Sequence, residues 1–322
     1  MAGGLAVVLS GGGARGAFQV GVLDELVTRR GVEIDIFVGV STGAIQALGG
    51  AQDDIPGLLD AWLGLRGNKD VYIGRGGIVG GLLGNDSLYD ARPLRARLKA
   101  FADEERLRAT GKKLRLGVVS LTSGAFRVVA ENTPGMADWV YASSAMPVFF
   151  RPLTTRAADG AEEQWVDGGV RDVTPLDAAL ELRPRAVLVV LASPPTPAAS
   201  APRRYSDFVS VGLRSVSILQ SEVVANDTAN ASLINDLIAA RERQEVLLTQ
   251  AGLSAEAQRR ILAPLDAELQ RYRFAPIRII APDREIAETL EFDPARIQAA
   301  IDAGRRAAAA SWASLEPVLR SV

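Results

Sequence analysis

Short apolar runs alternate with helical segments along most of the chain, and this alternation constrains the fold more than any other feature. The runs are rich in β-branched residues and occur at 5–9, 36–40, 114–121, 186–191 and 277–280. Such runs are typical of strands buried on both faces of a parallel sheet. Segments with the apolar spacing of helices lie between most of them. The pattern predicts an α/β fold of three layers, α/β/α, around a mainly parallel central sheet.

The organisation of the chain predicts one domain over 1–322, because no repeat, long charge run or domain linker interrupts it. Helical patterns at 207–241 and 245–271 indicate a C-terminal helical elaboration, 203–272, within that domain. Plain packing is favoured for it over a cap above the site or a surface for oligomerisation. The glycine-rich stretch 74–84 fits a loop better than a mobile flap.

Composition excludes several kinds of site. The 322 residues contain neither histidine nor cysteine, so a Ser-His-Asp triad, a catalytic thiolate and imidazole or thiolate metal ligands are all impossible. The formal net charge is −2, which offers no basic face for nucleic acid. No signal peptide or membrane-spanning run is recognised, which predicts a cytoplasmic protein and leaves peripheral membrane association open.

A strand, a sharp turn and a helix are predicted around Ser41. The apolar run that ends at Val40 leads into Gly39-Val40-Ser41-Thr42-Gly43, and small helix-forming residues follow. In such a turn the serine takes strained backbone angles and projects its hydroxyl above the sheet, while glycines two residues away on either side avoid collisions. This is the geometry of a nucleophile elbow. The alternative is a tight turn whose serine only caps the helix.

A glycine loop, Gly11-Gly12-Gly13-Ala14-Arg15-Gly16, joins the first predicted strand to a helix. Backbone N–H groups at the start of a helix lack internal partners and lie at the positive end of its dipole, so they favour an anion. The loop also fits GxGxxG, with Glu33 and Asp35 at about the distance of a ribose contact, so a dinucleotide site is one interpretation. A purely structural turn is another.

Asp167 follows a third predicted strand and precedes Gly168 and Gly169. By itself this motif fits a turn in which the aspartate bonds to its own backbone. However, the carboxyl ends of parallel strands share one edge of a sheet, so we expect the glycine loop, Ser41 and Asp167 to lie together. The chemistry that they allow is acyl transfer, with Asp167 as the general base for Ser41.

The negative charge that develops on a substrate carbonyl needs donors, and the backbone N–H groups of Gly12 and Gly13 are suited to this role. Arg15 has three interpretations: added positive charge, a contact for a phosphate headgroup, or an ion pair that faces solvent. Partial burial that raises the pKa of Asp167 would make it a stronger base.

These motifs, GGGARG at 11–16, GVSTG at 39–43 and DGG at 167–169, resemble in their order the patatin-like phospholipase family. The phrase ASSAMPVFF at 142–150 is similar too. The resemblance covers about the first 195 residues. It implies Ser41 as nucleophile, Asp167 as proton acceptor, Gly11 to Gly16 as the oxyanion loop, and Gly39, Gly43, Gly168 and Gly169 as supporting motif glycines.

The resemblance also implies a lipid acyl hydrolase that acts on phospholipids or related esters and needs no metal or cofactor. The expected partners are therefore a lipid ester and, transiently, a membrane surface. The sequence leaves three matters open: the quaternary state, acyl transfer to an acceptor other than water, and the headgroup. The alternatives are a nucleotide-binding module that uses the 11–16 loop and a lipid-binding scaffold without turnover.

Overall fold

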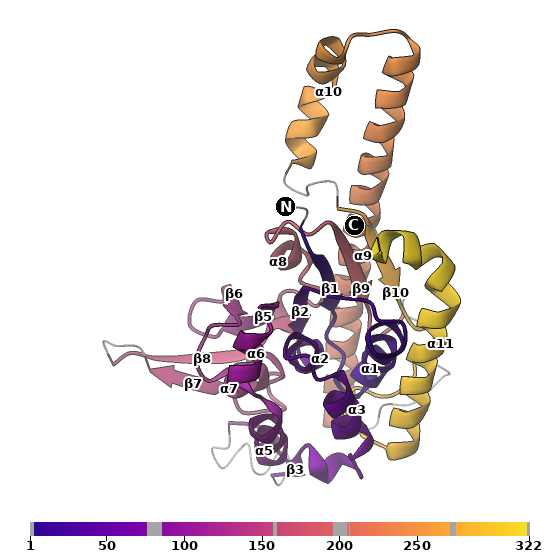
Figure 1. The fold of residues 1–322 in the computed structure, drawn as a ribbon. Coiled ribbons are helices and arrows are strands. Elements are labelled where there is room, and N and C mark those ends of the chain that lie inside the picture. The colour runs from indigo at the N-terminus through magenta and orange to yellow at the C-terminus, as the bar shows by residue number, and fades with distance from the viewer. Residues whose placement is uncertain are drawn as a thin grey trace.

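A computed structural model describes residues 3–75, 86–156, 160–195, 205, 207–270 and 275–320. Its centre is a mixed, mostly parallel sheet with the strand order β10-β9-β1-β2-β5-β8-β7 (Figure 1). The strands are β1 Leu5–Leu9, β2 Ile36–Val40, β5 Lys113–Ser120, β6 Phe126–Ala130, β7 Leu153–Arg156, β8 Glu162–Asp167, β9 Ala186–Val190 and β10 Ile277–Ile280. A separate two-stranded sheet pairs β3 Ile73–Gly74 with β4 Tyr89–Asp90.

Five of these strands, β10, β9, β1, β2 and β5, run parallel to one another. Their residues are almost all buried, which agrees with the continuous apolar runs of the sequence. Beyond them the sheet changes character, because β6 and β8 both pair antiparallel with β5, and β7 with β8. The three-layer, mainly parallel α/β architecture predicted from the sequence is confirmed.

Alternate residues of the parallel strands enter two hydrophobic cores, one on each face of the sheet. On β1, Leu5, Val7 and Leu9 face the first core, whereas Ala6 and Val8 face the second. The first core includes residues of α1 Ala17–Leu23, α2 Thr42–Ala51, α3 Ile55–Leu63, α5 Arg92–Phe101, α6 Glu104–Ala109, α7 Met136–Ser143 and α11 Pro294–Leu319. The second core includes residues of α8 Leu176–Leu180, α9 Phe208–Gln250 and α10 Ala255–Leu269.

Short single turns complete the structure. They are the 3-10 turns Gly13–Gly16, Asn68–Asp70 and Gly168–Val170, and the π turn Asp24–Arg29 that continues α1. Two of these turns, Gly13–Gly16 and Gly168–Val170, follow strands that end at the candidate site.

The C-terminal helices differ from the sequence prediction in one boundary. The prediction of a break between residues 241 and 245 was wrong, because α9 continues without interruption to Gln250. Glu242, Arg243 and Gln244 are good helix formers, so nothing ends the helix there. The helix ends at Gln250, shortly before Gly252, whose φ of +75° favours glycine, and Ser254 caps α10 by accepting from the Ala257 amide.

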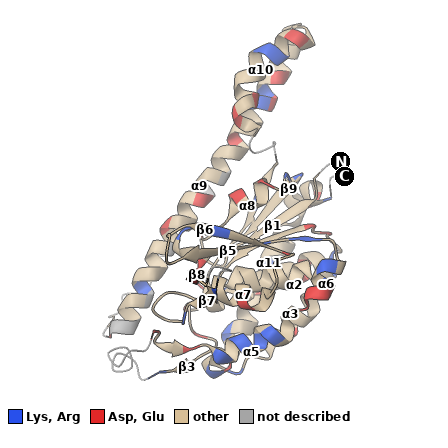
Figure 2. Cartoon of the chain, turned by 90° about the vertical axis from the view of Figure 1, so that its left-hand side faces the viewer, with Lys and Arg blue, Asp and Glu red and all other residues tan. Residues whose placement is uncertain are grey.

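The distal half of α9 and α10 form a hairpin that extends beyond the body of the molecule (Figures 1 and 2). In the part of the chain that the structure describes, no helix has both the length and the hydropathy needed to cross a membrane. Most of the predicted glycine-rich loop 74–84, namely residues 76–84, lies outside the described residues. The expectation of a single domain stays a prediction.

Candidate active site

Ser41 lies in the predicted turn between β2 and α2, with φ 57° and ψ −127°. These angles are strained for a residue with a side chain. A Cβ at Gly39 would lie 2.2 Å from the carbonyl oxygen of Gly43, and one at Gly43 would lie 2.1 Å from that of Leu9. Both positions therefore require glycine. The strand, turn and helix expected at 34–51 are present, with the geometry of a nucleophile elbow.

Two serines at the end of α7 hold the backbone of this turn. The Ser41 amide donates to Ser143 Oγ over 3.0 Å, and Ser143 Oγ donates to the carbonyl oxygen of Gly117 over 2.7 Å. Ser144 Oγ donates to the Ser41 carbonyl oxygen over 3.0 Å. All three serines are buried. These contacts fix Ser41 to β5 and α7, a role that the sequence did not assign to the Ser143-Ser144 pair.

Asp167 meets Ser41 because two strands abut along one edge of β5. β2 pairs with the first part of β5, where Val40 lies opposite Gly117. β8 pairs with the last part, where Asp167 lies opposite Val118, and β6 takes the other edge. Since β8 runs antiparallel to β2, the two strands end face to face. The expectation that Asp167 follows a strand of the parallel set was wrong, yet the two ends meet at the predicted edge.

The Asp167 side chain is buried, and this environment changes its acidity. The Gly169 amide donates a hydrogen bond to Oδ1 of this carboxyl over 2.8 Å, and the Ser41 side chain lies beside the same carboxyl. Each contact stabilises the charged form. Burial outweighs them because it penalises the charged form, and it raises the pKa of Asp167 from 3.8 to about 7. The turn bond that the sequence suggested for Asp167 is therefore present together with the contact to Ser41.

The glycine loop lies beside the serine. A Cβ at Gly11 would be 3.2 Å from the Cβ of Ser41. The amides of Gly11, Ala14 and Arg15 already donate, to the carbonyl oxygens of Val173, Thr289 and Gly12 respectively.

The amides of Gly12 and Gly13 donate no hydrogen bond to any described residue. Both residues line the same cavity as Ser41. Within the loop, these two amides are the donors that remain available to a ligand oxygen.

Arg15 is 4% exposed and forms an ion pair with Glu285 at 3.2 Å, while its Nε donates to the Gly12 carbonyl oxygen. The guanidinium thus links the backbone of the glycine loop to Glu285. Of the three interpretations of Arg15, an ion pair is what the structure contains: its Arg15 partner is buried and its Glu285 partner is exposed.

Glu33 and Asp35 do not approach the glycine loop as a ribose contact would require. Asp35 Oδ2 accepts from the Leu5 amide over 2.8 Å, at the opposite end of β1 from Gly11. Glu33 precedes Asp35 by two residues, in the connection that leads into β2. These two carboxylates are therefore not placed to bind the ribose of a dinucleotide at the glycine loop. Among the described residues, no cluster of three acidic side chains is suited to a metal ion.

A cavity is lined in part by Ser41 and Asp167. The free amides of Gly12 and Gly13 are on its wall. The rest of the wall is almost entirely apolar and belongs mainly to α2, α3 and α5. Its larger members are Ile45, Leu58, Trp62, Leu65, Val71, Leu94, Leu98, Phe101, Met146, Phe150, Leu290 and Phe292. This lining suits an apolar chain attached to a polar group beside Ser41.

Part of this wall comes from a segment that sequence reasoning missed, the stretch before α11. Thr289 accepts from the Ala14 amide through its carbonyl oxygen, and Leu290 and Phe292 line the cavity. Phe292 packs against Trp62 with ring centroids 6.4 Å apart. The segment is short and has no motif, so its position depends on tertiary packing alone.

A comparison with protein families decides the relationship of the chain. The model of the family described as Patatin-like phospholipase matches residues 7–180, more than half of the chain. The protein belongs to the patatin-like phospholipase family. The family relationship implies a lipid acyl hydrolase, typically a serine hydrolase.

Among solved structures, VipD from Legionella pneumophila is similar, with a TM-score of 0.45 and 17% sequence identity. The match covers 97% of this chain and 67% of VipD. No curated protein matched the sequence.

The Gly13→Ala variant of this patatin-like protein is expected to be strongly destabilised. Gly13 has φ +59°, and an added Cβ would lie 2.0 Å from the Thr289 carbonyl oxygen. Gly111 is a matched control, with φ +71° and no atom within 4 Å of an added Cβ. Backbone strain should cost each variant about 1–2 kcal/mol. We expect the clash to cost Gly13→Ala about 1–3 kcal/mol more in urea unfolding; equal stability of the two variants would contradict the described packing of the loop against Thr289.

Proposed function

We propose that this protein hydrolyses acyl esters of lipids through an acyl-Ser41 intermediate, with Asp167 as the general base. The proposal rests on one observation above all: a buried carboxyl and the side chain of a strained serine lie beside each other in the wall of an apolar cavity. The membership of the patatin-like phospholipase family supports the same chemistry.

In the first half of the reaction, Ser41 Oγ attacks the ester carbonyl carbon and its proton moves to the Asp167 carboxylate. The negative charge on the carbonyl oxygen is stabilised by the amides of Gly12 and Gly13, and one such donor is typically worth about 2.7–4 kcal/mol of the barrier. The carbon–oxygen bond to the leaving alcohol then breaks, and Asp167 returns the proton to that alcohol. The acyl group remains on Ser41.

In the second half, Asp167 takes a proton from water while the water oxygen attacks the acyl-Ser41 carbonyl. Collapse of this intermediate releases the fatty acid and returns the proton to Ser41 Oγ. Burial helps both halves, because a carboxyl with a pKa of about 7 is a stronger base than one at 3.8 and is still partly ionised at neutral pH. The active form requires the ionised carboxylate.

The apolar cavity fits the acyl part of the substrate, so we infer phospholipids or other lipid esters as the substrate class. Such molecules reside in membranes or micelles. The proposed function therefore implies transient contact with a lipid surface. Such contact does not require a membrane-spanning helix.

Release of fatty acid from phospholipid in mixed micelles tests this function. We expect release by the wild-type protein, and a rate at least about 1,000-fold lower for Ser41→Ala, because that variant lacks the nucleophile. Ser314→Ala, an exposed serine on α11, serves as control and should retain the wild-type rate. A wild-type protein that binds lipid without turnover would instead be a scaffold. Binding of nucleotides that survives Ser41→Ala, again without ester hydrolysis, would favour the nucleotide module.

A further inference from the structure

A second apolar cavity shares part of its lining with the cavity described above. Asp167 and Met146 line both cavities, so the two spaces are neighbours at the candidate catalytic residue. Nothing in the proposed acyl transfer uses this second space. We call it the α9 groove. Its lining is Leu88, Met146, Pro147, Val148, Phe149, Asp167, Gly169, Val170, Gly212, Val216, Leu219 and Val223.

One wall of the α9 groove is a single face of helix α9. Gly212, Val216, Leu219 and Val223 are spaced by four, three and four residues, so they form one stripe along the helix. A Cβ at Gly212 would lie 3.8 Å from the Phe149 ring, where the helix comes close to the opposite wall. Few charged residues occur in this half of α9, whereas the hairpin beyond carries many (Figure 2).

Three large apolar side chains in the α9 groove are unusually exposed for their type. Leu219 is 68% exposed, Val148 is 60% exposed and Val170 is 53% exposed. Single exposed apolar residues are common on protein surfaces, but several that line one cavity indicate a site for an apolar ligand. Among the described lining residues, Asp167 alone contributes a charged group, and it also lines the first cavity.

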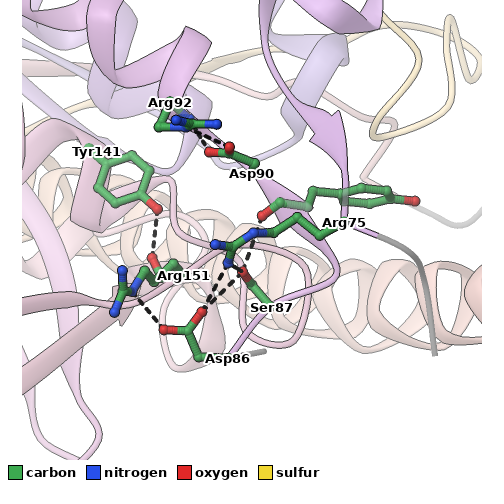
Figure 3. Close-up of polar contacts among 8 residues, drawn as sticks. Arg75, Asp86, Ser87, Asp90, Arg92, Tyr141 and Arg151 are labelled. Carbon is green, nitrogen blue, oxygen red and sulfur yellow. Dashed lines mark hydrogen bonds and ion pairs between the residues drawn. The ribbon is translucent and has the colours of Figure 1, made fainter. Parts of the chain in front are cut away.

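The wall opposite α9 is held firmly. The amides of Leu88 and Tyr89 donate to the carbonyl oxygens of Val148 and Phe149, each over 2.9 Å. Next to them, Asp86 lies between Arg75 and Arg151 and forms an ion pair with each, at 3.3 Å and 2.6 Å (Figure 3). These contacts fix the loop that carries Val148.

Val148 itself is held in an unfavourable conformation. Its φ is +72°, which is rare for a β-branched residue and costs about 1–3 kcal/mol. The side chain gains little burial in return, since it is mostly exposed to the groove. Strain of this kind persists where a side chain serves a purpose other than stability.

We propose that the α9 groove binds the second apolar chain of a two-chain lipid while the first chain occupies the cavity beside Ser41. The inference rests on the lipid hydrolase function proposed above and narrows its substrate class to diacyl lipids. A two-chain lipid branches at a polar linker, and the two cavities likewise share Asp167, beside which the ester would react. The α9 groove is apolar and open to solvent at the exposed residues, so a chain can enter it laterally.

Binding of ether lipids tests this inference without dependence on turnover. The probes are a glycerophosphocholine with two O-hexyl chains and its analogue with one O-hexyl chain, both below their micelle-forming concentrations, so that adsorption to a lipid surface plays no part. We expect the wild-type protein to bind the two-chain probe at least about tenfold more tightly in isothermal titration, because the second chain leaves water.

The variant Leu219→Asp places a charge in the α9 groove and is expected to reduce this preference to about threefold or less. Leu247→Asp is its matched control, since Leu247 is 57% exposed on the same helix but lies outside the groove lining. It should keep the wild-type preference. Val148→Gly removes a groove side chain and relieves the positive φ. We expect this variant to lose the preference for the two-chain probe and to have a thermal stability no lower than that of the wild type.

Equal binding of the two probes by the wild-type protein would overturn the inference, as would an unchanged preference in both Leu219→Asp and Val148→Gly. Hydrolysis of the diester counterpart separates the two proposals. If the preference depends on Leu219 but no ester is cleaved, the hydrolase function fails and the lipid groove remains. If esters are cleaved but the preference does not depend on Leu219 or Val148, only the groove fails.

Discussion

Asp167→Asn is expected to lower kcat for ester hydrolysis by about 100- to 10,000-fold, the contribution typical of a general base. Asparagine keeps the size of the side chain and can still accept the Gly169 amide, but it cannot take a proton from Ser41. In the wild type, kcat/KM should rise with pH through about 7 as Asp167 loses its proton. The residual activity of the variant should lack that step. A half-maximal rate below pH 5, or a variant with wild-type turnover, would assign the base elsewhere.

The same substitution should raise stability at high pH. Asp167 has a pKa of 3.8 when unfolded and about 7 when folded, so between these values the folded protein binds more protons. Stability therefore falls as pH rises from about 4 to about 7, and the full penalty, up to about 4 kcal/mol, remains above pH 7. Asparagine carries no such penalty. Urea unfolding should show a gain for Asp167→Asn at pH 8 that disappears at pH 4.

Asp60→Asn, an exposed aspartate on α3, is the control for this measurement and should show no comparable gain. If Asp167→Asn has the same effect on stability at pH 4 and pH 8, the carboxyl does not titrate between these values in the folded protein. Burial would then not raise its pKa as described.

Ser41→Gly is expected to abolish turnover while it stabilises the fold. The backbone angles of Ser41, φ 57° and ψ −127°, are accessible to glycine without strain. Relief of that strain should add about 1–3 kcal/mol to the free energy of unfolding. Hydrolysis should fall at least about 1,000-fold, because no hydroxyl remains to attack the ester.

Ser41→Ala is the matched control for this effect. It also lacks the hydroxyl, and with it the contact with Asp167, but it keeps the Cβ and hence the backbone strain. Chemical unfolding of the two variants at one pH isolates the strain. Glycine should be more stable than alanine at position 41, and a less stable glycine variant would show that the turn is not strained there.

Local patterns in the sequence were sufficient to predict much of the fold. The buried parallel strands follow from continuous apolar runs, and the turn at Ser41 follows from the glycines at 39 and 43, which the close approach of Leu9 and Gly43 requires. Each of these features depends on neighbours within a few residues or on a strand buried on both faces. The family resemblance agreed with the family match over residues 7–180.

Contacts between distant segments were not predictable in the same way. β8 pairs antiparallel with the last part of β5, on the edge that β6 does not occupy. Nothing near Asp167 in the sequence encodes that pairing. The Phe292 side chain reaches the cavity beside Trp62 from a segment 230 residues later in the chain. The α9 groove likewise needs α9 to pack beside the loop at Val148. In each case tertiary packing decides the position, and no local pattern specifies it.

The central claim is that Ser41 carries the acyl group during turnover, and trapping that intermediate tests it most directly. The wild-type protein is mixed with p-nitrophenyl butyrate, whose good leaving group makes acylation faster than the later attack by water, then quenched in acid, digested and analysed by mass spectrometry. The account predicts one butyryl group, on the peptide that contains Ser41, and none in Ser41→Ala. A butyryl group on another residue, or rapid release of p-nitrophenol with Ser41 unmodified at every quench time, would contradict it.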